Sequence, residues 1–177
     1  VIDAAPLVRA LGLEGRLVTM TGVEATSTVR SREAPNTFGH ANVFPLVADP
    51  LAYRGGAPDT EARRLRDLIA DVRTRESHPL VQLNHPRTGS GRRDDQNLFS
   101  HLSVTEAGFD PTRPLDDPAN RALVEPGSHG VRDLDFDAME LLNGRRLRAW
   151  HALRADWFSL LLQGELRTAT ANSDSHD

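Results

Sequence analysis

Near its end the sequence carries two side chains that often bind metal ions, Asp174 and His176, separated by one residue. The preceding residues, 166–172, alternate in a strand-like pattern. Residues i and i+2 of an extended segment point to the same face, so both side chains can reach a common centre. A carboxylate with an imidazole suits Zn²⁺, Mn²⁺ or Fe²⁺, whereas Ca²⁺ prefers a cage of oxygens. The pair therefore predicts part of a divalent-metal site.

Two further candidate ligands, Glu24 and His40, lie beside predicted strands. Glu24 ends a β-branched and apolar segment over 16–24, and His40 begins a second one over 40–47. If the second strand runs antiparallel to the first, the start of one and the end of the other lie at the same edge of the sheet. We then expect Glu24 and His40 to lie close together.

His85 and Glu140 follow the same rule. His85 comes directly after the short buried strand predicted over 80–84, and Glu140 lies in the strand predicted over 138–142. In parallel α/β folds, sites are built at the carboxyl edge of the sheet. The sequence therefore predicts that these side chains converge with the Asp174–His176 pair on one rim.

Each candidate also has an ordinary structural interpretation. A lone histidine at a strand end is most often a hydrogen-bonded structural residue, and Asp174 could simply cap a turn. Their joint placement at strand ends favours the metal site. The other histidines serve as contrasts: His78 precedes its strand, His151 lies within a helix, and His101 and His129 lie in a long loop where surface roles are expected.

The order of these elements predicts an α/β fold with a mainly parallel sheet. Its clearest helix places Leu65, Leu68, Ile69 and Val72 on one face. A segment over about 87–137, rich in Arg, Asp, Gly and Pro, is expected to be an irregular excursion of the kind that is functional or mobile. The strands are expected over 16–24, 40–47, 80–84, 138–142 and 166–172, and the helices over 3–11, 60–75 and 147–163. In the last helix, an aromatic stripe with Leu147, Trp150, Leu153, Trp157 and Leu161 is expected in the core.

Composition limits the possible functions. With 177 residues and 38% apolar content, the chain can form one domain with a core over 1–177. Its net charge of −4 disfavours non-specific nucleic-acid binding. The absence of cysteine excludes disulfides, thiolate metal sites and cysteine nucleophiles. No apolar run reaches the ~20 residues of a membrane span. Localisation and oligomeric state do not follow from the sequence.

Five short motifs resemble the polymerase and histidinol phosphatase (PHP) superfamily of metal-dependent hydrolases. The motifs "NHPR" and "MELLNG", and the helix before "TANSDSH", are most similar to its carbaryl-hydrolase-like branch. The resemblance covers nearly the whole chain apart from residues 88–130. In chain order the motifs are "TGVEATS" around Glu24, "FGHANVF" around His40, "VQLNHPR" around His85, "DAMELLNG" around Glu140 and "NSDSH" at the end.

The resemblance implies a distorted (β/α)7 barrel that, when complete, holds two or three divalent metal ions at the carboxyl ends of its strands. Glu24 would then be the bridging carboxylate, His40 and His85 would each bind a single ion, and Asp174 and His176 would close the site. Asp174, beside the metal, could also take part in proton transfer. Glu140, in the "MELLNG" motif, would lie behind the ligands or against the substrate.

One departure from the family pattern is large. The family opens with a His-x-His motif on its first strand, but residues 1–23 contain no histidine. The chain is therefore expected to be the later part of a PHP domain, a fragment whose barrel is incomplete at its N-terminal side. The alternative is a natural protein that has lost half of its site.

The expected function is hydrolysis of a small-molecule substrate, either a phosphoester or an ester, amide or carbamate. Arg87, Arg92 and Arg93 follow His85 and could hold an anionic substrate such as a phosphate, since guanidinium groups pair well with such anions. Equally, they could belong to a solvated loop. The alternative function is a degenerate, non-catalytic PHP-like domain that serves binding or structure. A His-x-His motif upstream would favour the enzyme.

Overall fold

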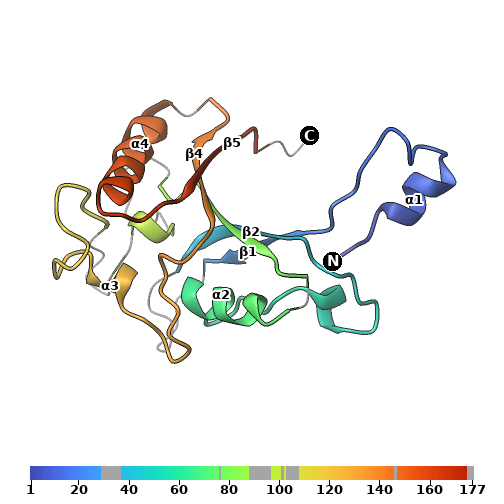
Figure 1. The fold of residues 1–177 in the computed structure, drawn as a ribbon, viewed down its shortest axis with the longest axis horizontal. Coiled ribbons are helices and arrows are strands. Elements are labelled where there is room, and N and C mark those ends of the chain that lie inside the picture. Colours follow the sequence, from blue (N-terminus) through green and yellow to red (C-terminus); the bar gives the residue numbers. More distant parts are fainter. Residues whose placement is uncertain are drawn as a thin grey trace.

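The chain folds as a five-stranded mixed sheet, with the helices over 65–73 and 147–162 packed on it and the first helix standing apart (Figure 1). The computed structural model describes residues 1–28, 37–75, 77–87, 97–100, 102, 108–145 and 147–174. The sheet order is β1-β2-β3-β4-β5, and within the described ranges the sheet stays open, with no closure into a barrel. The predicted α/β class is confirmed. The strands are β1 Val23–Ser27, β2 Gly39–Phe44, β3 Leu80–Asn84, β4 Ala138–Asn143 and β5 Thr168–Asn172.

The strand directions correct the expectation of a mainly parallel sheet. Strand β2 is antiparallel to both β1 and β3, whereas β3, β4 and β5 are parallel to one another. After β2 the chain crosses to the carboxyl end of β1; Thr60 in this crossing and Thr26 of β1 line the same hollow. The next helix then carries the chain back to the start of β3. The start of β2 therefore lies at the same edge as the ends of the other four strands.

Three of the helices were expected from the sequence. They are α1 Ala5–Ala10, α2 Leu65–Arg73 and α4 Leu147–Leu162, while the short α3 Arg121–Val124 was not foreseen. Positive φ at Gly12 and Gly164 allows the turns that end α1 and α4. Two 3-10 turns span Tyr53–Gly56 and Leu98–Ser100. Within the described part of the chain, no helix has the length and hydropathy needed to cross a bilayer.

The first strand was predicted at the wrong position. It runs over Val23–Ser27 and not over 16–24, so Glu24 lies near its beginning. The apolar side chains before it stay largely exposed: Val18 is 96% exposed and Met20 is 65% exposed. Ala25 and Ser27, in contrast, are buried beneath the sheet. Burial on one face, and not β propensity alone, decides where the strand forms.

One hydrophobic core lies between the sheet and the helices. Because successive strand residues point to opposite faces, one face of the sheet collects apolar side chains. The predicted apolar face of α2 packs against them, and its four members are at most 1% exposed. The strand residues in the core are Ala25, Ala41, Val43, Val81, Leu83, Met139 and Leu141.

The segment over 87–137 also contributes to this core. Phe99 packs against Phe109 and Phe136, with ring centroids 5.1 Å and 6.5 Å away. Near the end of the segment Asp133 is buried, accepts a hydrogen bond from the Arg66 backbone N–H (2.8 Å) and pairs with Arg64 at the start of α2. The described part of this segment is therefore a packed element. Its irregularly spaced apolar residues left no periodic signal in the sequence.

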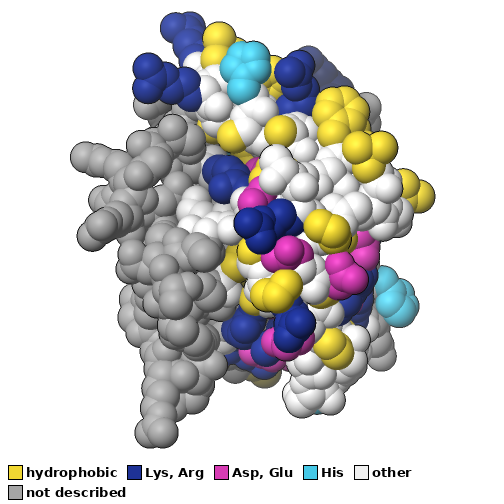
Figure 2. Space-filling model, turned by 90° about the vertical axis from the view of Figure 1, so that its left-hand side faces the viewer, with side chains coloured by type: hydrophobic (Ala, Val, Ile, Leu, Met, Phe, Trp, Pro, Cys, Tyr) yellow, Lys and Arg dark blue, Asp and Glu magenta, His cyan; other side chains and the backbone are white. Residues whose placement is uncertain are grey.

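The surface over α4 and the neighbouring loops mixes charges of both signs. Figure 2 shows basic and acidic side chains interspersed with apolar ones on this face. Several of the arginines in the described ranges form ion pairs; Arg132, for example, pairs with Asp135 and Glu165, each at 2.7 Å. Such pairs fasten residues before β4 to the segment that leads into β5.

The buried face of α4 differs from the predicted stripe. Leu153 is buried as predicted, but Leu147 is 63% exposed and Leu161 is only partly buried. The buried face also contains Ala149 and Leu160, which were not predicted. Trp150 and Trp157 lie at its border, half-buried against the core. The indole N–H of Trp157 donates to the carbonyl oxygen of Arg167 (2.8 Å). This hydrogen bond is available at the border of the core, and it explains why Trp157 lies there.

Two leucines on α4 test this assignment of the core. Leu160 is fully buried and Leu162 is 87% exposed, although both belong to the same helix. We expect Leu160→Ala to lower the free energy of unfolding by about 2–5 kcal/mol, because it removes buried contacts and leaves a cavity. Leu162→Ala should change it by less than about 0.5 kcal/mol. Urea denaturation followed by tryptophan fluorescence measures both, and equal losses would contradict the placement of α4.

Candidate metal centre

The face of the sheet opposite the core is polar. Thr26 pairs with His40 and His40 with Asn84, so these three side chains point to the same face on neighbouring strands. Glu24 and Glu140 lie on this face as well, on β1 and β4. Four strands thus bring hydrogen-bonding and ionisable groups to one surface. His40 and Asn84 lie near the edge where β1, β3, β4 and β5 end, and the Glu24 side chain, from the beginning of β1, contacts both of them.

His40 lies at the start of β2, in the middle of this surface. Its Nδ1 lies 3.1 Å from the hydroxyl oxygen of Thr26 and 3.8 Å from Oε1 of Glu24. Because Nδ1 is engaged with Thr26, Nε2 is the nitrogen left to bind a metal ion. A partner on one ring nitrogen typically fixes the tautomer and orientation of a ligating histidine.

Glu24 is held by an amide but stays accessible. Asn84 donates its side-chain N–H to Oε1 of Glu24 (2.8 Å), and Gln82 donates in turn to Oδ1 of Asn84 (3.0 Å). The Glu24 side chain is 38% exposed. A carboxylate has about four lone-pair sites, so Glu24 retains acceptor capacity for metal ions.

His85 follows β3 with a backbone in the left-handed region (φ 25°). Its ring lies beside that of His40, with centroids 5.0 Å apart. Its Nδ1 is buried and has no hydrogen-bond partner among the residues that the structure describes. Buried polar atoms are rarely left unpaired, and a functional role is one explanation for such an atom. A nitrogen of this kind fits a metal ligand.

Asp174 follows β5 and is half-buried, also with a left-handed backbone (φ 53°). It lies close enough to His40 for its negative charge to raise the pKa of that imidazole. Positive φ in residues other than glycine is uncommon and tends to occur at functional sites. His176 lies outside the described residues.

Of the five predicted ligands, the structure places His40 beside Glu24 and His85, and Asp174 is near enough to affect the charge of His40. Among the residues that the structure describes, no three His, Asp or Glu side chains are arranged to hold one metal ion. The chemistry of the donor set fits a divalent ion, while a complete coordination shell is not formed by the described side chains. His78 and His151 are exposed, and His78 lies before β3, at the opposite edge.

The arginine that follows His85 faces another partner. Both Nε and one terminal nitrogen of Arg87 bind the carboxylate of Asp156 on α4, at 2.5 Å and 3.0 Å. Burial raises the pKa of the Asp156 carboxyl, and the charge of Arg87 opposes that rise. Arg87 therefore anchors the turn after His85 to α4. Arg92 and Arg93 lie outside the described residues.

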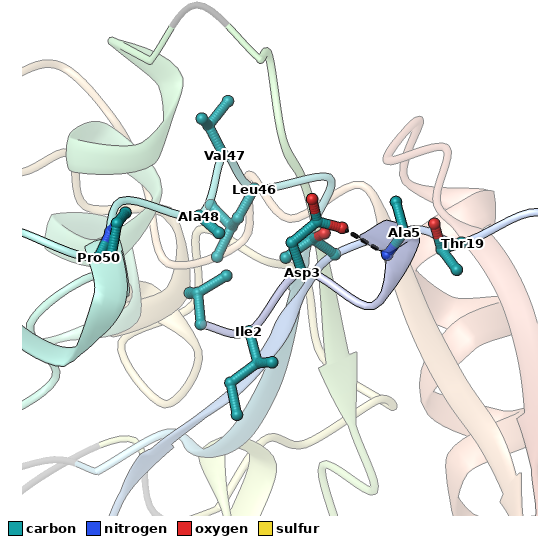
Figure 3. Close-up of a pocket in the computed structure, with 10 residues that line it drawn as sticks. Ile2, Asp3, Ala5, Thr19, Leu46, Val47, Ala48 and Pro50 are labelled. Atoms are coloured by element: carbon teal, nitrogen blue, oxygen red, sulfur yellow. Dashed lines mark hydrogen bonds between the residues drawn. The ribbon is translucent and has the colours of Figure 1, made fainter. Parts of the chain in front are cut away.

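A cavity of about 650 Å³ lies at the other end of β2, between the N-terminal segment and the loop after Phe44 (Figure 3). Asp3, its one acidic lining residue, accepts a hydrogen bond from the backbone of Ala5 (2.9 Å). No histidine lines it. A smaller hollow of about 350 Å³ borders Glu24 and Asn42 on the polar face. Cavity size therefore does not mark the predicted site.

Several polar residues of this site were not identified from the sequence. Thr26, Asn84 and Asn172 contact predicted site residues through their side chains. Each lies two residues from another polar or ionisable residue, Thr26 after Glu24 and Asn172 before Asp174. The period of two within a strand could have indicated that these residues share its face.

Comparison with known proteins found no matching family model, curated protein or solved structure. The likeness to the PHP superfamily therefore depends on the five motifs in the sequence. The chemistry of the site depends on the contacts described above.

The electrostatics of His40 give a test in the metal-free chain. Burial lowers the pKa of His40 below 6.5; His85 lowers it further, whereas Glu24 and Asp174 oppose the shift. We expect an NMR titration midpoint for His40 below 6.5, compared with the chain unfolded in urea. Glu24→Gln should lower the midpoint further, because it removes a negative charge.

The same shift predicts how stability depends on pH. The folded state binds the His40 proton more weakly than the unfolded state does, so the contribution of His40 to stability is present above pH 6.5 and is lost as the pH falls towards the folded-state pKa. An NMR titration midpoint for His40 at or above 6.5 would contradict the burial of His40 beside His85.

Proposed function

We propose that this chain is part of a PHP-type metal-dependent hydrolase that acts on a small-molecule substrate. The observation that carries the proposal is the position of His40 on the polar face of the sheet, beside Glu24 and His85 and within the electrostatic influence of Asp174. A histidine–carboxylate set drawn from separate strands is typical of Zn²⁺, Mn²⁺ or Fe²⁺ sites. The order of these residues in the chain also follows the family motifs.

The open sheet is compatible with the larger barrel that the family resemblance implies. Within the described ranges, no strand pairs with the outer edge of β1 or of β5. Upstream strands inserted between these two edges would close a distorted (β/α)7 barrel. The polar face would then line the inside of the barrel, and the helices α2 and α4 would remain outside, where they pack now.

The described side chains have distinct roles in this proposal. His40 would bind through Nε2 and His85 through its buried Nδ1, while Glu24 would offer one oxygen to each of two ions. Asp174 would complete the site with His176 and could move a proton during the reaction. When bound, divalent ions lower the pKa of a coordinated water and polarise a carbonyl or phosphoryl oxygen.

The class of bond that is cleaved remains a choice between two chemistries. A phosphoester fits the superfamily as a whole, and an ester, amide or carbamate fits the carbaryl-hydrolase-like branch. Arg87 gives no support to an anionic substrate, since its guanidinium is occupied by Asp156. Any arginine contact to a phosphate would have to come from elsewhere, with Arg92 and Arg93 as candidates.

A second candidate function is a non-catalytic binding or structural domain of the same type. It is favoured by one observation: the described residues contain no group of three ligands around one point. A catalytic ion typically has three protein ligands and an open position. The two candidates therefore differ in metal affinity and in turnover, which can be measured separately.

Metal binding can be tested on the 177-residue chain itself. Titration calorimetry with Mn²⁺ and with Zn²⁺ should detect binding to the original chain. His85→Ala should weaken this binding at least about tenfold, because loss of a direct metal ligand should reduce affinity at least as much as loss of a residue that hydrogen-bonds a ligand. His78→Ala is the matched control and should leave affinity unchanged, since His78 lies at the other edge. Equal effects of the two substitutions would show that the site has been assigned to the wrong residues.

Hydrolysis should be tested on a polypeptide extended upstream through any His-x-His motif. An aryl phosphate monoester, an aryl phosphodiester and an aryl carbamate are suitable substrates. We expect His85→Ala to abolish most turnover of the substrate that is cleaved, with His78→Ala close to the original protein. Tight metal binding without turnover of any of these substrates would favour the binding domain.

A further inference from the structure

Glu140 is a buried carboxylate at the centre of the polar face, only 2% exposed. Its Oε2 accepts the backbone N–H of His85 (2.7 Å) and the side-chain N–H of Asn143 (3.4 Å). Its Oε1 accepts the side-chain N–H of Asn172 (2.9 Å). One carboxylate therefore contacts the residue after β3, the end of β4 and the end of β5.

A bulge in β4 makes this arrangement possible. The pairing of β4 with β5 shifts register between Glu140 and Leu142, so that Asn143 comes to lie opposite Asn172. In a regular strand, Asn143 would point to the face opposite Glu140, because their separation is odd. A bulge adds one residue and can re-aim a side chain. Both asparagines can therefore donate to the same carboxylate.

Glu140 and Glu24 differ in what their oxygens can still do. Both oxygens of Glu140 accept hydrogen bonds and the residue is buried, whereas the Glu24 side chain is 38% exposed with one short amide contact. No arginine forms an ion pair with Glu140 within the described ranges. Glu140 is therefore placed to hold other residues, while Glu24 is placed to bind an ion.

We infer that Glu140 is a positioning residue that fixes His85 and the segment leading to Asp174 relative to each other. This inference deepens the proposed function and rests on it. Glu140 fixes the backbone N–H of His85, whose left-handed φ is unfavourable without support. Asn172, two residues before Asp174, ties the end of the edge strand to the same carboxylate. Two predicted ligands from separate strands thus share one hydrogen-bonded anchor.

Three substitutions at Glu140 distinguish the effect of its side-chain length from the effect of its negative charge. Glu140→Gln keeps the length and one acceptor oxygen, and Asn172 can turn its amide to present an oxygen to the new NH₂ group. Glu140→Asp keeps the charge but is one methylene shorter, so it cannot span His85 and Asn172 together. Glu140→Ala removes both contacts. A positioning role predicts that Gln preserves function and that Asp behaves like Ala.

The first readout is NMR of the metal-free chain, which does not depend on the proposed function. The His85 amide proton should lie downfield and exchange slowly in the original chain and in Glu140→Gln. It should move upfield and exchange faster in the Asp and Ala variants, while Leu83 amide protection in β3 reports that the sheet is intact. An unshifted His85 amide in Glu140→Ala would overturn the positioning role.

The second readout is metal affinity by calorimetry. We expect Glu140→Asp and Glu140→Ala to bind Mn²⁺ or Zn²⁺ about 10- to 100-fold more weakly, as is typical when a partner behind a ligand is lost. Glu140→Gln should bind almost as well as the original chain. The reverse order, with Asp active and Gln inactive, would make Glu140 a ligand or a substrate contact and would overturn the inference.

Asn172→Ala tests the anchor without disturbing a buried residue, since Asn172 is exposed. It should weaken metal binding while leaving the His85 amide resonance in place, because the Oε2 contact is retained. Thr168→Ala, at the other end of the same edge strand, is the matched control and should change neither. If Asn172→Ala and Thr168→Ala bind metal equally well, the tie between Glu140 and β5 has no role. If no variant binds metal, the metal site fails, and the NMR result still decides the anchor.

Discussion

The two-residue period of the strands is the constraint on which the rest of the structure depends. It sends one set of side chains into the core beneath α2 and α4, and the alternate set to the opposite face. A shift of one residue in the pairing of any strand would exchange these sets and expose the core. The polar face and the core are therefore specified together: the apolar residues fix the register, and the register fixes where His40, Asn84 and Glu140 lie.

Burial of polar groups on this face creates a second requirement. A buried amide or carboxylate is costly unless it is hydrogen-bonded, so each has to find a partner within the face. Gln82, Asn84 and Glu24 form one hydrogen-bonded series across β3 and β1. Asn172, Glu140 and the backbone of His85 form a second series across β5, β4 and β3. Satisfying these groups also orients the predicted ligands, so the interactions that make the buried groups tolerable also arrange the site.

Local patterns in the sequence predicted the elements that are periodic and buried. Strand β3 was predicted with its exact bounds, and α2 with all four of its core residues, because both patterns reflect burial directly. Strand β1 was predicted too early in the chain because residues 16–22 have strand-like composition, although their apolar side chains, such as Val18 and Met20, stay exposed. The core residues of 98–136 were missed because their spacing matches no regular element. For the site, motif order identified residues from several strands. The two-residue period could have added Thr26 and Asn172, whereas Asn143 faces Glu140 only because of a bulge that no local pattern reveals.

Strand β5 connects the site to the stability of the fold. It is an edge strand that lies almost entirely exposed on both faces, so it is held mainly by its ladder with β4 and by the Asn172–Glu140 bond. Asp174, which follows it, shares a surface with His40 on the far side of β3. A metal ion bound by both Asp174 and His40 would link the end of β5 to β2, and its binding free energy would stabilise the packing of β5. Metal binding and the ordering of β5 would then be coupled, and the hydrogen bond between Glu140 and Asn172 would hold β5 in place before any ion binds.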